Sequence, residues 1–191
     1  MSDIQAVQWF PGHMAKTRRK ITEDLKLVEL IAELVDARIP QSSSNPVLRN
    51  IIKSKPKIVL LNKSDMADPV QTNRWISRYR EEGTVAIALD SKTGKGMSAF
   101  FQAAREVLKE QIAAWERKGM RGRPIRIMVL GIPNVGKSSF INRMLAGSGA
   151  GKAEVRDKPG VTRENRWFTV GKGFELLLSL IHISEPTRPR L

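Results

Sequence analysis

Short apolar runs alternate along this chain with longer stretches in which apolar side chains recur every three or four residues. The runs are typical of buried strands, and the longer stretches are typical of helices that cover a sheet. The predicted strands are Leu30–Val35, Lys57–Leu61, Thr84–Leu89 and Ile125–Leu130. The predicted helices are Thr17–Val28, Pro46–Lys53, Pro69–Glu81, Met97–Arg117 and Lys137–Leu145. This alternation predicts an α/β domain with a mostly parallel sheet flanked by helices.

A hairpin and a linker complete the predicted arrangement. Phe168–Val170 and Phe174–Leu178 are short apolar runs separated by a turn that contains two glycines, which is typical of a β-hairpin. Residues 117–124 combine two glycines, a proline and four basic side chains. That composition predicts a solvated linker between the helix that ends at Arg117 and the strand that begins at Ile125. Its basic side chains could contact nucleic acid or could simply be hydrated, and the sequence leaves both open.

The net charge and the composition indicate which kinds of partner this chain could bind. The 191 residues contain 33 Lys and Arg against 19 Asp and Glu, which gives a net charge of +14. Such a balance favours a polyanionic partner, although a basic surface that serves only solubility fits equally well. The chain has no cysteine, which excludes disulfides, thiolate zinc sites and cysteine nucleophiles. No apolar stretch approaches the ~20 residues that span a bilayer, and the N-terminus lacks the features of a secretory signal, so we expect a cytoplasmic protein without a membrane partner.

The segment Gly131–Ser138 matches the pattern G-x-x-x-x-G-K-[ST] of phosphate-binding loops. A predicted strand precedes it and a predicted helix follows it, as this motif requires. Backbone N–H groups in such a loop point at one anion, and the helix N-terminus adds partial positive charge. We therefore expect Lys137 to contact the β- and γ-phosphates of a nucleotide and Ser138 to ligate Mg²⁺. The other expected nucleotide contacts of this loop are Gly131, Pro133, Asn134, Val135, Gly136 and Ser139.

A second motif indicates which base is bound. Asn62-Lys63-Ser64-Asp65 follows the predicted strand Lys57–Leu61, and ligands bind at the carboxyl ends of strands in open α/β sheets. The Asp65 carboxylate can accept hydrogen bonds from N1–H and the exocyclic amine of guanine. Adenine offers no such donor pair, so discrimination on the order of 10⁴ is possible. We expect Asn62 to brace the loop and the stem of Lys63 to lie along the base.

The segment Asp90–Gly94 supports the same assignment. It follows the strand Thr84–Leu89 and matches the S-A/K-x-G loop that closes over the guanine edge in GTPases. The expected contacts from this loop are Ser91, Lys92, Thr93 and Gly94. Read alone, the segment is also compatible with an ordinary turn between a strand and a helix, with Ser91 as the helix cap.

The order of these motifs resembles that of one particular GTPase family. In ordinary GTPases the phosphate loop precedes the base-reading motifs, whereas here Asn62–Asp65 and Ser91–Gly94 precede Gly131–Ser138. That order resembles the circularly permuted GTPases, and Trp9–Met14 and Val35–Pro40 are similar to the YlqF type. The resemblance implies a circularly permuted Ras-like P-loop NTPase fold over residues 1–178. Residues 117–124 would be the junction that rejoins the original ends.

The resemblance also implies roles that the residues alone do not indicate. Thr162, in the loop Asp157–Arg163, would belong to the first switch and ligate Mg²⁺. Asn134 is similar to the asparagine that accompanies potassium dependence in related GTPases. His13 would orient the attacking water in place of the usual glutamine, so that His13, Lys137 and Thr162 form the expected catalytic set. A His13 that only satisfies hydrogen bonds near an N-terminal turn is the alternative.

The resemblance implies that the protein binds and hydrolyses GTP during maturation of the large ribosomal subunit. It also implies a monomer that contacts rRNA. Candidate RNA contacts are Lys16, Arg18, Arg19 and Lys20, together with Arg117, Lys118, Arg121 and Arg123. Three alternatives stay open. A P-loop ATPase or kinase of another class would leave Asn62–Asp65 unexplained. An RNA-binding assembly factor would hold the nucleotide without turnover, and a truncated fragment would have no function.

The sequence departs from the family after Phe174–Leu177. A D-x-P-G motif and then a helical C-terminal domain are expected there, and the sequence continues with neither. We therefore expect an incomplete GTPase domain, with residues 179–191 as a tail foreign to the family. Since the second switch would supply part of the γ-phosphate contact, we also expect slow hydrolysis and a weak preference for GTP over GDP.

Overall fold

A seven-stranded sheet with strand order β3-β2-β1-β4-β7-β6-β5 forms the centre of the protein. The computed structural model describes residues 19–44, 52, 55–146, 155–156, 165–171 and 173–179. The strands are β1 Leu30–Asp36, β2 Lys57–Asn62, β3 Val85–Ala88, β4 Ile125–Leu130, β5 Val155–Arg156, β6 Asn165–Val170 and β7 Phe174–Ser179. The helices are α2 Pro40–Ser43, η1 Ser64–Met66, α4 Pro69–Glu81, α5 Met97–Val107, α6 Lys109–Arg117 and α7 Lys137–Ala146, and residues 19–25 are also helical.

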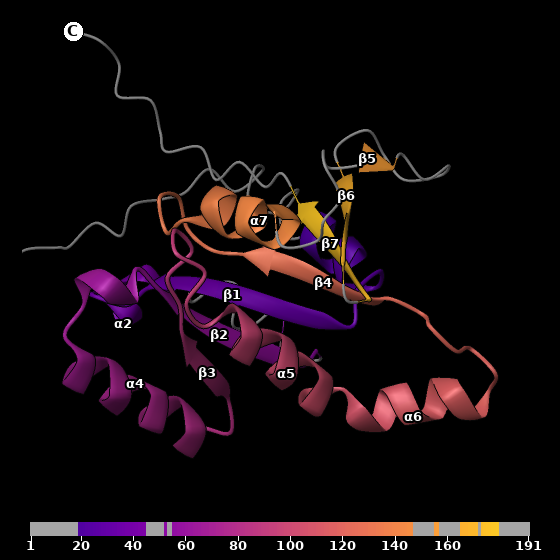
Figure 1. The fold of residues 1–191 in the computed structure, drawn as a ribbon, viewed down its shortest axis with the longest axis horizontal. Coiled ribbons are helices and arrows are strands. Elements are labelled where there is room, and N and C mark those ends of the chain that lie inside the picture. Colours follow the sequence, from indigo (N-terminus) through magenta and orange to yellow (C-terminus); the bar gives the residue numbers. More distant parts are fainter. Residues whose placement is uncertain are drawn as a thin grey trace, which may run out of the picture.

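The neighbouring strands β3, β2, β1, β4 and β7 all run parallel, and β6 runs antiparallel to β7 and β5. The predicted mostly parallel sheet is therefore confirmed, and so is the predicted hairpin, which is β6 and β7. In Figure 1 the carboxyl ends of β1 and β4 point to the left, where α2 follows β1. Because these strands are parallel, the loops that follow β1, β2, β3 and β4 emerge at one edge of the sheet.

Helices cover both faces of the sheet, because alternate side chains of the central strands point in opposite directions. On β1, Leu30 and Leu34 belong to the main core cluster, which also contains side chains of α5, α6 and α7. Ile31 belongs to a second cluster with Ile21 of the helical residues 19–25. Val35 packs in a third cluster with Tyr79 of α4. The predicted arrangement of a sheet flanked by helices is confirmed, and none of the helices in the described residues is long and apolar enough to cross a membrane.

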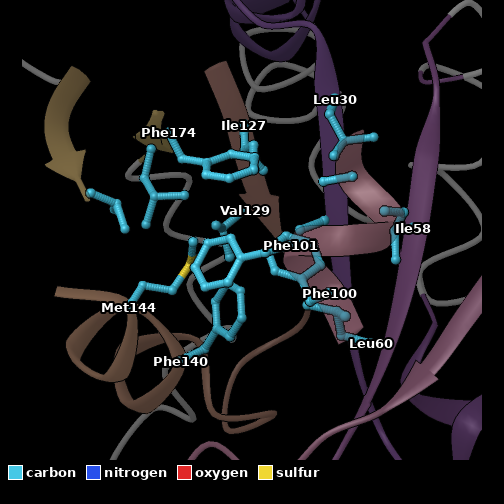
Figure 2. Close-up of a cluster of buried hydrophobic side chains, with 14 of the residues drawn as sticks. Leu30, Ile58, Leu60, Phe100, Phe101, Ile127, Val129, Phe140, Met144 and Phe174 are labelled. Carbon is cyan, nitrogen blue, oxygen red and sulfur yellow. The ribbon is translucent and has the colours of Figure 1, made fainter. Parts of the chain in front are cut away.

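Aromatic rings fill the main core cluster (Figure 2). The ring of Phe100 lies 5.8 Å from that of Phe101 and 5.6 Å from that of Phe140, the latter at 72° in an edge-on contact. Phe100 and Phe140 are completely buried. Since Phe140 lies on α7 and Phe100 on α5, these rings hold the helix after the phosphate loop against the helix after Asp90–Gly94.

The predicted single helix Met97–Arg117 is wrong: two helices, α5 and α6, meet at Leu108. The backbone of Leu108 leaves the helical region, with φ −102° and ψ 9°. Leu108 and Trp115 nevertheless both stay in the main core cluster. The apolar stripe is therefore continuous although the helix is not, and periodicity alone could not locate the break. Of the predicted helix Pro46–Lys53, only Ile52 lies within the described residues.

The connection from α6 to β4 is anchored at the sheet edge opposite the carboxyl ends (Figure 1). The Nη2 of Arg123 lies 2.9 Å from Oε1 of Glu29, and the guanidinium lies 4.5 Å from the ring centre of Trp115. The backbone N–H of Arg126 donates to Oε2 of Glu29 at 2.8 Å. Residues 117–123 are exposed, as the predicted solvated linker requires, although an ion pair and an aromatic contact hold the side chain of Arg123.

The aromatic core predicts a large effect of truncation. We expect Phe100→Ala to lower the free energy of unfolding by about 3–5 kcal/mol, since it removes a buried ring and leaves a cavity. Urea denaturation followed by circular dichroism measures this change. Val70→Ala, at a position with 59% exposure, is the control and should change stability by less than about 0.5 kcal/mol. Equal effects of the two substitutions would contradict this packing.

Candidate functional site

Three loops that are far apart in the sequence meet at the carboxyl edge of the sheet. They follow β2, β3 and β4 and contain Asn62–Asp65, Asp90–Gly94 and Gly131–Gly136 respectively. The strand order places β2 next to β3, and β1 between β2 and β4. The parallel direction of the strands and this order together bring the three predicted motifs to one place.

Asn62 connects all three loops through a single buried side chain. Its Nδ2 donates to the carbonyl oxygen of Val135 in the phosphate loop at 2.8 Å. Its Oδ1 accepts from the backbone N–H of Ser91 at 3.1 Å and from the Ser91 hydroxyl at 2.8 Å. The residue is only 2% exposed. Since water cannot replace these partners at a buried site, the amide fixes the distance between the loops.

The phosphate loop needs glycine at two positions because other atoms approach its backbone closely. A Cβ on Gly131 would lie 2.8 Å from the carbonyl oxygen of Leu34. Gly136 has φ +99°, and a Cβ there would overlap Nδ2 of Asn62. Any larger residue at 136 would therefore displace the amide that joins the loops.

Two residues with left-handed backbone conformation face each other across this edge. Lys63 has φ 60° and Asn134 has φ 66°, which is uncommon for residues other than glycine. The Nζ of Lys63 donates to the carbonyl oxygen of Asn134 at 2.7 Å and to Oδ2 of Asp36 at 3.1 Å. A left-handed lysine costs roughly 1–2 kcal/mol. Strain of this kind concentrates at functional sites.

Lys137 places a positive charge in the phosphate loop that no carboxylate pairs with among the described residues. Its Nζ donates to the carbonyl oxygens of Gly131 at 2.9 Å and Ile132 at 2.7 Å. Burial lowers the pKa of Lys137, and no nearby carboxylate among the described residues offsets that effect. Because a half-buried ammonium held only by carbonyl dipoles is poorly compensated, an anion at this loop would stabilise it.

The loop after β3 is held closed by its own aspartate. Oδ1 of Asp90 accepts from the backbone N–H of Lys92 at 2.9 Å, and Oδ2 accepts from the hydroxyl of Thr93. These contacts, that of the Thr93 hydroxyl above all, lower the pKa of Asp90 below its usual value. The backbone N–H of Gly94 donates to the carbonyl oxygen of Asp90 at 2.8 Å. These hydrogen bonds within the loop define its shape.

A cavity of about 250 Å³ opens between these loops. The predicted nucleotide contacts that line it are Asn62, Lys63, Asp65, Ser91, Lys92, Gly136 and Ser139. Thr93 and Gly94 line a neighbouring hollow with Arg143. Pro133, Asn134 and Ser138 lie exposed on the phosphate loop and the first turn of α7. His13 and Thr162 lie outside the described residues, so their predicted roles stay predictions.

Three residues with no assigned role in the sequence also belong to this site. Arg38 lines the cavity, Asp36 pairs with Lys63, and Nε of Arg143 lies 3.4 Å from the carbonyl oxygen of Ser91. Asp36 ends β1, so the rule that selected Asn62, a polar residue at the carboxyl end of a strand, could have selected it too. The sequence carried no comparable signal for Arg143, which lies within a helix.

Comparison with known families identifies the class of domain. Residues 126–179 match the family described as 50S ribosome-binding GTPase. This stretch contains most of β4, the phosphate loop, α7 and the β6–β7 hairpin. The parallel sheet, the phosphate loop and this match together define a P-loop GTPase fold.

More specific relatives share nearly the whole chain. Ribosome biogenesis GTPase A of Priestia megaterium is 51% identical over 172 residues, which cover 90% of this chain and 59% of that protein. The protein of the same name from Bacillus pumilus is 46% identical over 171 residues, which cover 90% of this chain and 60% of that protein. The GNP-bound YlqF from T. maritima superposes with a TM-score of 0.55 at 26% identity, covering 85% of this chain and 56% of that one.

The chain is therefore a relative of the YlqF-type, circularly permuted GTPases, as the order of its motifs predicts. It spans about three fifths of the length of the curated relatives it matches.

The buried amide of Asn62 gives a sharp test of the assembled site. We expect Asn62→Ala to lower the free energy of unfolding by about 1–3 kcal/mol, because it leaves the buried polar groups of Val135 and Ser91 without their hydrogen-bond partner. Urea denaturation without nucleotide measures this loss. Asn73→Ala, on the exposed face of α4, is the matched control, and its effect should stay below about 0.5 kcal/mol. A loss no larger than that of the control would show that the bridge is not a structural constraint.

Proposed function

We propose that the cavity at the carboxyl edge of the sheet binds guanine nucleotides. The observation that carries this proposal is the set of hydrogen bonds made by Asn62. Through them the base-reading segment, the loop after β3 and the phosphate loop surround one cavity, although Asn62 and Val135 are 73 residues apart. Such an assembly is what a nucleotide needs, because its base and its phosphates must be held at a fixed distance.

The base end of the cavity contains Asp65, whose carboxylate would accept from N1–H and the exocyclic amine of guanine. Lys63 is held by Asp36 and Asn134, so its stem is fixed before the base arrives. The loop Asp90–Gly94 after β3 is likewise held in shape by hydrogen bonds to the Asp90 carboxylate. Preorganisation of this kind favours affinity, because little side-chain freedom is lost on binding.

The phosphate end contains Lys137 and the backbone of Gly131–Gly136. The carbonyl contacts of Lys137 would give way to the β- and γ-phosphates, whose charge compensates the half-buried ammonium. The hydroxyl of Ser138, exposed at the start of α7, fits a ligand of Mg²⁺ in the pattern of such loops. Bound Mg²⁺ would neutralise phosphate charge during hydrolysis.

Hydrolysis of GTP is part of the proposal, and it rests on the GTPases that this chain resembles. His13 would orient the attacking water, and Thr162 would complete the Mg²⁺ ligands when the γ-phosphate is present. Asn134, at the exposed tip of the phosphate loop, would contribute to a K⁺ site.

The proposed biological partner is the large ribosomal subunit at a stage of its assembly, with contacts to rRNA. Relatives that share 90% of this chain carry the name ribosome biogenesis GTPase A. The net charge of +14 agrees with an RNA partner. Arg117, Lys118 and Arg121 are exposed in the linker and are the candidate contacts there, whereas Arg123 is engaged with Glu29.

Base recognition by Asp65 predicts a switch of nucleotide preference. We expect Asp65→Asn to weaken GDP binding by about 10²- to 10⁴-fold, since two charge-assisted hydrogen bonds are lost. Xanthosine diphosphate should bind the variant better than GDP, because the Asn amide can donate to the carbonyl at position 2 of xanthine. Competition against fluorescent GDP or its xanthosine analogue measures both affinities.

Asp68→Asn is the control for this switch, because Asp68 caps α4 by accepting from the backbone N–H of Gln71 at 2.8 Å and does not line the cavity. Its preference for GDP should match that of the unaltered chain. An Asp65→Asn variant with unchanged GDP affinity would show that the base is read elsewhere.

Turnover separates the GTPase from an assembly factor that only holds the nucleotide. We expect slow release of phosphate from GTP in Mg²⁺ and K⁺, a faster rate when large ribosomal subunits are added, and none after chelation of Mg²⁺. Phosphate release with and without subunits is the measurement, with the Lys137→Ala variant as the inactive control. Bound GTP that stays intact with or without subunits would favour the alternative without turnover.

A further inference from the structure

The segment Val35–Pro40 matched the YlqF type in sequence but had no assigned role. Its Asp36 is the last residue of β1 and pairs in register with Asn62 at the end of β2. Because β1 lies between β2 and β4, Asp36 stands between the base-reading segment and the phosphate loop. The residue is only 5% exposed, so its carboxylate requires partners.

Two cations share the Asp36 carboxylate. The guanidinium of Arg38 forms a two-pronged contact, with Nε 2.9 Å from Oδ1 and Nη2 2.7 Å from Oδ2. The Nζ of Lys63 lies 3.1 Å from the same Oδ2. The contact with the Arg38 side chain is the largest cause of a pKa of Asp36 well below the usual range for a carboxyl. The group is therefore ionised at every pH at which the protein would be assayed.

A purely local role does not account for this arrangement. The backbone N–H of Arg38 already donates to Oδ1 of Asp36 at 3.0 Å, which closes the turn after β1. The two side-chain contacts of Arg38 with Asp36 are additional to this turn, and they fix the direction of the guanidinium. Lys63, the other partner of Asp36, follows a different strand, β2. One carboxylate thus orients cations from the ends of two neighbouring strands.

The fixed guanidinium lies at the wall of the cavity. Arg38 lines it together with Lys63 and Asp65, and the side chain of Arg38 remains 43% exposed. A guanidinium is planar and weakly hydrated, and it packs well against aromatic faces. Purine rings offer such a face. The hydrogen bond to Asp36 is the largest cause of the raised pKa of Arg38, and the negative charge of Asp65 also contributes to it.

We propose that Arg38 is a further nucleotide-binding residue that packs its guanidinium against the guanine ring, and that Asp36 is the positioning residue for both Arg38 and Lys63. This inference rests on the proposed guanine site and adds Arg38 to Lys63 as a second cationic side chain that contacts the base. Lys63 and Arg38 would then hold the base while Asp65 reads its edge, so that affinity and selectivity come from different residues.

The test uses the 191-residue chain and two probes, GDP and inorganic pyrophosphate, in competition with fluorescent GDP. Pyrophosphate reports on the phosphate loop alone, whereas GDP also reports on the base pocket. We expect Arg38→Gln to raise the Kd for GDP by about 2- to 30-fold, the range that cation–π contacts span from exposed to desolvated cations. The Kd for pyrophosphate should stay unchanged, and Arg38→Lys, which keeps the charge but not the plane, should lie between.

Arg78→Gln is the matched control. Arg78 is also paired with a carboxylate, that of Glu82 at 3.3 Å, and packs over the ring of Trp75 at 5.2 Å, but it lies on α4 away from the cavity. Its GDP affinity should equal that of the unaltered chain.

Positioning by Asp36 has its own signature. We expect Asp36→Asn to weaken GDP binding more than Arg38→Gln does, because it releases Lys63 as well. In a chain that already carries Arg38→Gln, the further effect of Asp36→Asn should shrink, since the two residues act through one contact. Fully additive effects would show that Asp36 does not act through Arg38.

Two results would overturn the role of Arg38. If Arg38→Gln has the same Kd for GDP as the Arg78→Gln control, Arg38 does not contact the base. If Arg38→Gln weakens GDP and pyrophosphate binding by the same factor, Arg38 only stabilises the fold. An unaltered chain that binds no GDP would instead overturn the proposed function, and with it this inference.

Discussion

The hydrogen bonds of the Asn62 side chain are the constraint on which the rest of the site depends. Val135 accepts from one end of this amide and Ser91 donates to the other, and the group is buried from water. Loss of this amide would leave its buried partners unpaired, at a cost of about 1–3 kcal/mol. The spacing between the base-reading loops and the phosphate loop is therefore set by one residue, and Gly136 is required because nothing larger fits beside that amide.

Permutation of the chain is compatible with this constraint because the strands meet in space rather than in sequence. The motif carried by β2 precedes that carried by β4 in the sequence, yet only β1 separates the two strands in the sheet. The connection that leads into β4 lies at the opposite edge, where Glu29 holds Arg123 and the backbone of Arg126. Residues 117–124, the predicted junction of the original ends, thus lie at the edge opposite the proposed nucleotide site, so a change in their sequence would leave the three loops of that site in place.

Local pattern predicted the sheet and the helix Pro69–Glu81, whose bounds are those of α4. It did not predict the break at Leu108, because buried residues continue on both sides of the break. For the site, the motifs identified which residues converge but not the role of Asp36 or Arg38. Their contacts with Lys63 and the cavity depend on the alignment of β1 with β2, which is a tertiary property that no local pattern encodes.

The central claim is that one guanine-selective pocket forms from motifs in permuted order. Its most direct test is equilibrium binding of fluorescent GDP to the chain in Mg²⁺ and K⁺, competed with unlabelled GTP or ATP. The account predicts displacement by GTP and none by ATP at the same concentration. Equal displacement by ATP, or no GDP binding by a chain that circular dichroism shows to be folded, would contradict it.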